Sequence, residues 1–147
     1  MELRPFEPRD GEETAKLFYE SVHRINKRDY PPNQLDALAP SIPLVQEWIK
    51  TFEGKQTWVA LKEGKIIGFA DLSADGFLGR IYVHPDHQRQ GVGSALCNRL
   101  ECGQIGGIST HASITAKPFF EGRGYRFIKE RATRYGSLWL TDFLMEK

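Results

Sequence analysis

The sequence predicts one α/β (α+β) domain over residues 1–147, with a mixed, mostly antiparallel sheet of about six to seven strands flanked by helices. Its 147 residues suit a single domain that can bury a core, and 40% hydrophobic and 27% charged residues are typical of a globular protein. Apolar residues recur at helical spacing in the first third of the chain, and a period of two begins near residue 56.

The first third of the chain is predicted to be mainly helical. Asp10 and Glu13 have the spacing of a capping box, which predicts a helix that continues to about Arg24. The other elements expected here are an edge strand over residues 3–6, a helical turn over residues 33–38, and a helix over residues 43–52 capped by Ser41.

Strands are expected to dominate the rest of the chain. Turns at Glu63-Gly64, Asp75-Gly76 and Tyr135-Gly136 separate runs that alternate as strands do. The expected strands cover residues 56–62, 65–72, 77–84, 108–113, 125–133 and 137–145, with helices over residues 94–100 and 116–122.

Composition and charge argue against several functional classes. The net charge is +1, with 20 basic against 19 acidic residues, so we expect no nucleic-acid partner. The basic run over residues 126–134 alternates as one solvated strand face does. Apolar runs are too short for a membrane span, and residues 1–5 lack a signal-peptide core, so we expect a cytoplasmic protein. Cys97 and Cys102 have no further ligands at metal-binding spacing, so no metal is expected.

The most informative segment runs from Ile81 to Leu96. An apolar strand ends at Pro85, and a short polar loop then leads to Gly91 and Gly93 at the start of a predicted helix. Backbone N–H groups and the positive end of the helix dipole would face a phosphate there, and glycine lets an anion approach the backbone. Leu96 stands where a dinucleotide-binding turn needs its third glycine, and the chain contains no P-loop. A different phosphorylated ligand is therefore expected.

The pattern Gln88-x-x-Gly91-x-Gly93 resembles the acetyl-CoA pyrophosphate loop of the GNAT acetyltransferase family, which reads Arg/Gln-x-x-Gly-x-Gly/Ala. Residues 113–125 are similar to the second signature of that family, with matches at Ala116, Glu121, Gly124 and Tyr125. Two positions depart from it, because Ser113 stands where the family usually has Asn and Phe120 where it often has Tyr. The element order of the whole chain fits one GNAT domain. Residues 30–35 and 112–121 further resemble the YafP-type branch of this family.

The resemblance implies that acetyl-CoA is the co-substrate. The backbone of Ile81, Tyr82 and Val83 would pair with pantetheine, with the Val83 N–H directed at the thioester oxygen. The residues implied to wrap the pyrophosphate are Arg89, Gln90, Gly91, Val92, Gly93 and Ser94, with further contacts from Gln88, Ser113, Lys117 and Phe120.

The catalytic groups are not fixed by the family pattern. Phe120 cannot protonate the departing CoA thiolate as a Tyr would; Tyr82 or Tyr30 could take over, and a thiol with a pKa of about 8.5 also leaves without an acid. His23, His84, Asp71 and Asp75 are the candidate bases. Among these groups, His23, Tyr30 and Asp71 are the residues that we expect to act in catalysis. The two prolines after Tyr30 are expected to hold its ring rigidly on a loop, without burying it in a helix.

The predicted function is an acetyl-CoA-dependent N-acetyltransferase in which an amine attacks the thioester directly. The acceptor would be a small-molecule amine or a peptide amine, and the protein a monomer or a homodimer. Residues 23–38 are expected to select the acceptor. The alternative is an acyl-CoA-binding sensor or regulatory module without turnover, which the absence of a hydroxyl at Phe120 favours.

Overall fold

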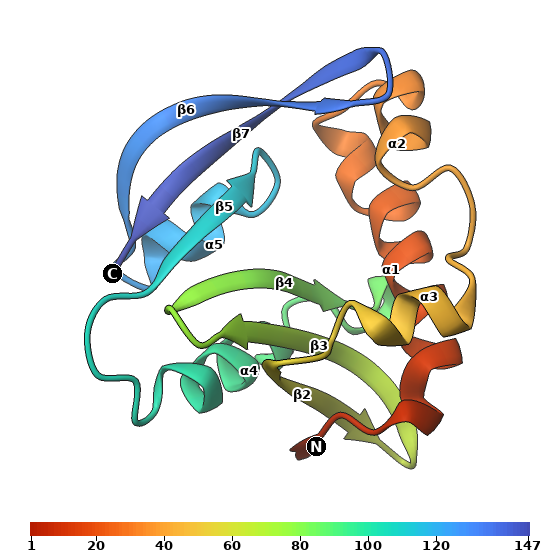
Figure 1. Ribbon diagram of the computed structural model, residues 1–147, viewed down its shortest axis with the longest axis vertical. Coiled ribbons are helices and arrows are strands. Elements are labelled where there is room, and N and C mark those ends of the chain that lie inside the picture. The colour runs from red at the N-terminus through yellow and green to blue at the C-terminus, as the bar shows by residue number, and fades with distance from the viewer.

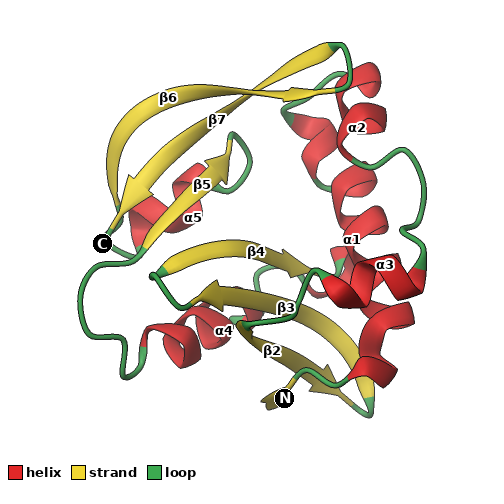
Figure 2. Cartoon of the chain, in the orientation of Figure 1, coloured by secondary structure: helices red, strands yellow, loops and turns green.

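Seven strands form one sheet in this computed structural model, which describes residues 1–147 (Figures 1 and 2). The strand order is β1-β2-β3-β4-β5-β7-β6, and all neighbouring strands are antiparallel except β4 and β5. The mixed, mostly antiparallel sheet predicted from the sequence is confirmed. The strands are β1 (Glu2–Pro5), β2 (Lys55–Lys62), β3 (Lys65–Ser73), β4 (Phe77–Val83), β5 (Ser109–Ser113), β6 (Arg126–Tyr135) and β7 (Leu138–Glu146).

Helices cover both faces of this sheet. On one face, α1 and α3 pack over β2 and β3, and on the other face α4 packs over the same two strands while α5 packs beside β5. None of the helices has the length and apolarity needed to cross a lipid bilayer. The helices are α1 (Gly11–Arg24), α2 (Pro32–Leu38), α3 (Val45–Lys50), α4 (Val92–Glu101) and α5 (Lys117–Gly122), with short 3-10 helices η1 (Pro8–Asp10), η2 (Asn26–Arg28) and η3 (Pro85–His87).

Strand β3 is buried on both faces, which explains its nearly continuous apolar sequence. On the α4 face, Gly68 allows close contact, because a Cβ there would lie 2.8 Å from Val92 Cγ1. On the α1 face, the Phe69 ring packs edge-on against Trp48 and Phe52. The core on the two faces of β3 therefore fixes the position of α4, whose first turn borders the site described below.

The capping box predicted at Asp10 and Glu13 is wrong. The Asp10 carboxylate is buried and accepts two hydrogen bonds from Arg4 of β1, at 2.7 and 2.9 Å, and one from the Glu7 N–H. Burial alone would raise the pKa of Asp10, but the Arg4 guanidinium and the Glu7 N–H outweigh burial and lower that pKa. Glu13 instead accepts a hydrogen bond from the Ile66 N–H on β3. Helix α1 thus begins at Gly11 without a side-chain cap, because tertiary partners take both carboxylates.

The sheet has two edge strands of different character. Strand β1 has four residues and ends at Pro5, as the sequence predicted for an edge. Strand β6 has ten residues, pairs only with β7 and is exposed along most of its length. Figure 1 shows the long β6–β7 hairpin curving from the C-terminus over to the side of α2.

The sheet opens between β4 and β5. These parallel strands pair only at Phe77 with Ser109 and at Leu78 with Thr110. Just after Leu78, the register of β4 against β3 shifts, so that Gly79 is an extra residue in β4. A Cβ on Gly79 would come within 2.8 Å of the Asp71 carboxylate, so the bulge needs glycine. Beyond this bulge β4 and β5 diverge, and the remainder of β4 has a free edge.

Candidate functional site

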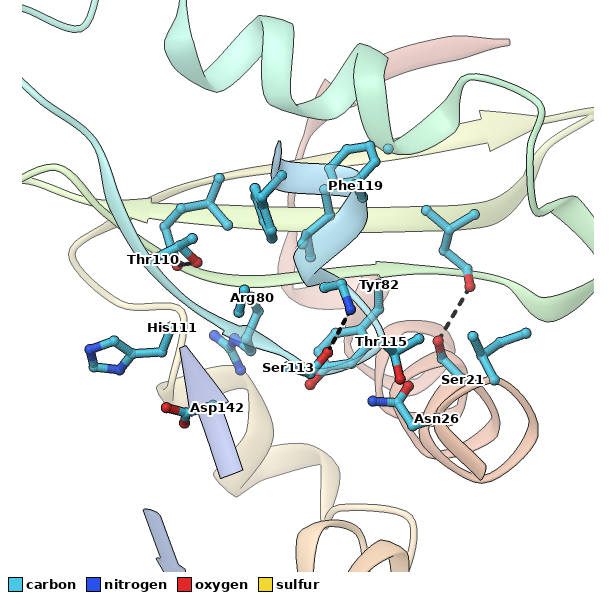
Figure 3. Close-up of a pocket in the computed structure, with 18 of the residues that line it drawn as sticks. Ser21, Asn26, Arg80, Tyr82, Thr110, His111, Ser113, Thr115, Phe119 and Asp142 are labelled. Atoms are coloured by element: carbon cyan, nitrogen blue, oxygen red, sulfur yellow. Dashed lines mark hydrogen bonds between the residues drawn. The ribbon is translucent and has the colours of Figure 1, made fainter. Parts of the chain in front are cut away.

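A cleft of about 870 Å³ occupies the gap between β4 and β5 (Figure 3). Its walls come from the end of α1, the β4 edge, the loop before α4, the first turn of α4, β5, α5 and the β6–β7 hairpin. Segments far apart in the sequence therefore meet at one place, the point where the sheet opens.

The free edge of β4 presents backbone groups to this cleft. The His84 N–H donates to the Ile67 carbonyl on β3, at 2.8 Å. Because alternate residues of a strand point their N–H groups in opposite directions, the N–H groups of Ile81 and Val83 point away from β3, towards the gap. The Val83 carbonyl already accepts hydrogen bonds from the Gln88 side chain at 2.8 Å and from the Ser21 hydroxyl at 3.3 Å. Both N–H groups remain as donors on the cleft wall.

The loop before α4 brings further backbone donors to the same cleft. Gly91, the residue before the helix, has φ +80°, and Arg89 has φ +60°, a conformation that non-glycine residues adopt rarely. The first hydrogen bond of α4 joins the Ala95 N–H to the Gly91 carbonyl. The preceding N–H groups in the helix, those of Val92, Gly93 and Ser94, therefore have no partner within α4. These N–H groups are thus available as hydrogen-bond donors at the cleft, an arrangement that suits an anion.

Gly93 has a packing role that the sequence did not reveal. A Cβ at this position would lie 3.2 Å from two ring atoms of Phe119 on α5, tighter than ordinary contact. The second glycine of the loop thus lets α4 and α5 approach each other beside the cleft, in addition to leaving the backbone open.

Most of the expected cofactor residues line the cleft, and two do not. Gln90 points to His87, 3.3 Å from its Nδ1 atom. Lys117 pairs with Glu121 at 3.3 Å and lies over the rings of Phe127 and Phe143. The expected residues that line the cleft are Ile81, Tyr82, Val83, Gln88, Arg89, Gly91, Val92, Gly93, Ser94, Ser113 and Phe120.

Two of the expected catalytic residues lie outside the cleft. His23 Nε2 is 2.7 Å from the Ala39 carbonyl, and the imidazole packs against Tyr19 of its own helix. Asp71 is 1% exposed beneath the sheet surface, and its carboxylate accepts a hydrogen bond from Arg80 Nε at 2.6 Å. Neither group borders the cleft, because His23 is engaged by the Ala39 carbonyl just after α2, and Asp71 by Arg80. We therefore do not propose them as bases.

Tyr30 does line the cleft, but as a structural link. The residue lies outside any helix, between η2 and α2, and its ring is buried, with 6% of the residue exposed. Its hydroxyl donates to the Thr141 carbonyl at 2.8 Å and accepts from the Ile114 N–H at 2.9 Å. Burial raises the pKa of Tyr30. The phenol therefore joins the segment after α1 to β7 and to the end of β5, rather than supplying a proton.

Substituting Tyr30→Phe is expected to lower the free energy of unfolding by about 1–3 kcal/mol, because the Ile114 N–H and the Thr141 carbonyl, both partly buried, lose their partner. Urea denaturation followed by far-UV circular dichroism would measure this loss. Tyr19→Phe is the matched control, since no hydrogen bond engages that hydroxyl in the structure. Equal stability of the Tyr30 variant and wild type would contradict the structural role.

Tyr82 has a different environment within the cleft wall. Its ring packs against Phe18 and Phe69, and no residue of the protein hydrogen-bonds its hydroxyl. Burial raises the pKa of Tyr82 above the ordinary value for tyrosine, so the phenol stays protonated at neutral pH.

One wall of the cleft consists of residues that the sequence analysis did not identify. On β6 and β7, Asp142 accepts hydrogen bonds from Arg131 at 3.0 Å and from Thr133 at 2.8 Å. Figure 3 shows His111 of β5 beside Asp142 on the wall of the cleft. Only the alternation of β5 was available as a signal, because it puts His111 on the same face as Ser113. The pairing of Arg131 with Asp142 depends on the β6–β7 register.

A family model described as "Acetyltransferase (GNAT) domain" matches residues 26–146, which is most of the chain. The chain belongs to the GNAT acetyltransferase family. Among GNAT relatives, it is 29% identical to the uncharacterized N-acetyltransferase YafP of Escherichia coli (strain K12) over 145 residues, 99% of this chain and 94% of the relative.

Solved GNAT structures have the same fold. A GCN5-related N-acetyltransferase from Rhodopseudomonas palustris superposes with a TM-score of 0.93 at 30% identity, covering 99% of this chain and 94% of the other. A phosphinothricin acetyltransferase of the GNAT superfamily from Sinorhizobium meliloti, solved with acetyl-CoA, has a TM-score of 0.73 at 19% identity, over 99% of this chain and 86% of the other. The likeness at 19% identity concerns the fold alone.

Proposed function

We propose that this GNAT protein transfers an acetyl group from acetyl-CoA to an amine, in the cleft between β4 and β5. The observation that carries the proposal is the meeting of two sets of backbone donors at one cleft, those on the β4 edge and those before α4. A long molecule with an amide-rich arm and a pyrophosphate is complementary to such an arrangement. The acetyl-CoA bound by the Sinorhizobium meliloti relative supports this choice of donor.

The residues of this chain fit coenzyme A in two stretches. The N–H groups of Ile81 and Val83 would bind the pantetheine arm as a neighbouring strand would, with Ser113 on the facing strand. The N–H groups of Val92, Gly93 and Ser94, together with Gly91 and the Arg89 side chain, would bind the pyrophosphate. Gln88 holds the loop in place through its hydrogen bond to the Val83 carbonyl.

Acyl transfer needs stabilisation of the thioester oxygen as it gains negative charge. The Val83 N–H, which the family resemblance assigns to this role, lies nearer the pyrophosphate site than the Ile81 N–H does. The Ile81 N–H is therefore our candidate, and a fixed backbone donor needs no reorganisation during the reaction. Phe120 supplies no proton, since it is an apolar ring buried against Phe119 and Tyr125. A CoA thiolate with a pKa of about 8.5 leaves and takes its proton from solvent.

The acceptor would reach the thioester from the side of α2 and the β6–β7 hairpin. This part of the cleft carries polar groups at its surface, including Asn26, Thr133, Tyr135 and Asp142. A small-molecule amine or the amine of a peptide is compatible with such a wall, and we propose this class of acceptor.

Acetylation of a panel of amines is the direct test. The protein would be incubated with acetyl-CoA and with small primary amines, amino acids and short peptides, and mass spectrometry would detect the gain of one acetyl group. Release of the CoA thiol would be followed in parallel. Transfer to at least one amine is expected. Binding of acetyl-CoA without transfer to any amine would contradict the enzyme and favour the alternative of an acyl-CoA sensor.

A further inference from the structure

His111 occupies a distinctive position in the open sheet. It is the first residue of β5 beyond the last pairing with β4, at Thr110. Thr110 and Ala112 are buried in the core on the α4 and α5 face, so alternation puts His111 on the opposite face with Ser113. This is the face of β7 that carries Asp142, which lies directly opposite Ser113. His111 thus lies inside the cleft, on the side from which an acceptor would enter.

His111 is also the histidine whose ring nitrogens are free. In His23, Nε2 is bound to the Ala39 carbonyl. In His84, Nδ1 accepts the Asp86 N–H and Nε2 lies 3.4 Å from a carboxylate oxygen of Glu20. In His87, Nδ1 lies 3.3 Å from Gln90.

No hydrogen bond or ion pair within the protein engages His111, whose ring instead packs edge-on against Phe77, with centroids 4.7 Å apart. Its nitrogens can therefore accept a proton from a ligand or from a water molecule in the cleft.

The charges around His111 favour its neutral form. Partial desolvation of the ring beside Phe77 and the positive charges of Arg131 and Lys129 on β6 lower the pKa of His111, and the Asp142 carboxylate on β7 raises it by less. Phe77, its neighbour on β4, contributes no charge. At neutral pH the imidazole is therefore uncharged, which is the form that accepts a proton.

We propose that His111 is the general base of acetyl transfer, a role that rests on the proposed function. The amine nitrogen attacks the carbonyl carbon of the thioester, and the C=O electron pair moves to oxygen. The proton released by the nitrogen passes to a His111 ring nitrogen, directly or through one water. The C–S bond then breaks, its electron pair stays on sulfur, and the CoA thiolate takes a proton from solvent. His111 returns its own proton to solvent.

Titration of the free protein tests the charge state without any turnover. The pKa of His111, followed by NMR through its ring proton, is expected to lie below the ordinary histidine value of about 6.5. Lys129→Gln should raise it, because this substitution removes a positive charge that favours the neutral form. A His111 pKa above neutral pH, or a pKa that does not change in Lys129→Gln, would overturn the assignment of His111 as the base.

Kinetics with an acceptor from the amine panel test the proton transfer itself. His111→Ala is expected to lower kcat/KM at neutral pH by about 100-fold or more, with the Kd for acetyl-CoA changed by less than about threefold. In His111→Ala, the fall of kcat/KM at acidic pH should disappear, and added imidazole should restore part of the rate. In Lys129→Gln that fall should move to higher pH.

Two outcomes would overturn the role of His111. Wild-type kinetics in His111→Ala would remove the need for this base, and loss of acetyl-CoA binding without imidazole rescue would make His111 a structural residue. If the wild-type protein acetylates no amine, the proposed function fails and this inference fails with it. If the wild type is active and His111→Ala equals it, only the inference fails.

Discussion

Gly91→Asp is expected to abolish the stabilisation that acetyl-CoA gives to this protein. A ligand at one hundred times its Kd stabilises the native state by about 2.7 kcal/mol, so wild type should melt at a clearly higher temperature with acetyl-CoA. An aspartate at the start of α4 would add a side chain and a negative charge where we propose that the pyrophosphate binds. Differential scanning fluorimetry, with and without acetyl-CoA, would measure the difference.

Gly103→Asp is the matched control for this substitution. Gly91 and Gly103 have φ +80° and +81°, and a Cβ on either would meet no atom within 4 Å. Both substitutions therefore impose a similar backbone strain of about 1–2 kcal/mol, but Gly103 follows α4 and lies away from the cleft. The Gly103 variant should keep the full response to acetyl-CoA. An unchanged response in Gly91→Asp would exclude this loop as the pyrophosphate site.

Asp71→Ala is expected to lower the free energy of unfolding by about 3–5 kcal/mol, the usual result of removing one partner from a buried ion pair. The Arg80 guanidinium would lose the carboxylate 2.6 Å from its Nε atom. It would keep its hydrogen bonds to Thr51 and its place over the Phe52 ring, and these contacts would hold it in the same partly buried position without a counter-charge.

Chemical denaturation of Asp71→Ala and wild type would give the two free energies of unfolding. Glu12→Ala serves as the control, because it breaks an exposed pair with Lys16 on α1 and should cause no measurable change. A wild-type stability for Asp71→Ala would contradict the structural role of the ion pair. It would then be reasonable to test Asp71 again as a catalytic group.

Much of the fold was predictable because its signals are local. The period of two and the turn glycines located every strand within a few residues, and the apolar spacing located the helices. The capping box predicted at the start of α1 was wrong because its side chains bind partners that the local pattern does not reveal. Asp10 and Glu13 have the local pattern of a cap, but their carboxylates bind partners outside the helix, Arg4 on β1 and the Ile66 N–H on β3.

The candidate site was predictable only where one continuous segment forms it. Residues 81–94 contain both the β4 edge and the loop before α4, so the spacing of residues in the sequence was enough to predict this part of the cleft. The facing wall depends on the strand order β5-β7-β6 and on a register that opposes Arg131 and Asp142. Neither follows from local patterns. The burial of Asp71 beneath Arg80 likewise depends on the bulge at Gly79, one strand away.

The exposed edge of the sheet at β6 has a consequence for how copies of this chain meet in concentrated solution. An edge strand of ten residues offers unpaired backbone groups to any other strand, and such edges lead to aggregation when nothing protects them. Here the edge carries four cationic side chains, and an antiparallel approach by an identical strand would bring like charges together. They are Arg126, Lys129, Arg131 and Arg134. This basic run therefore opposes fibre-like stacking of one molecule on the next.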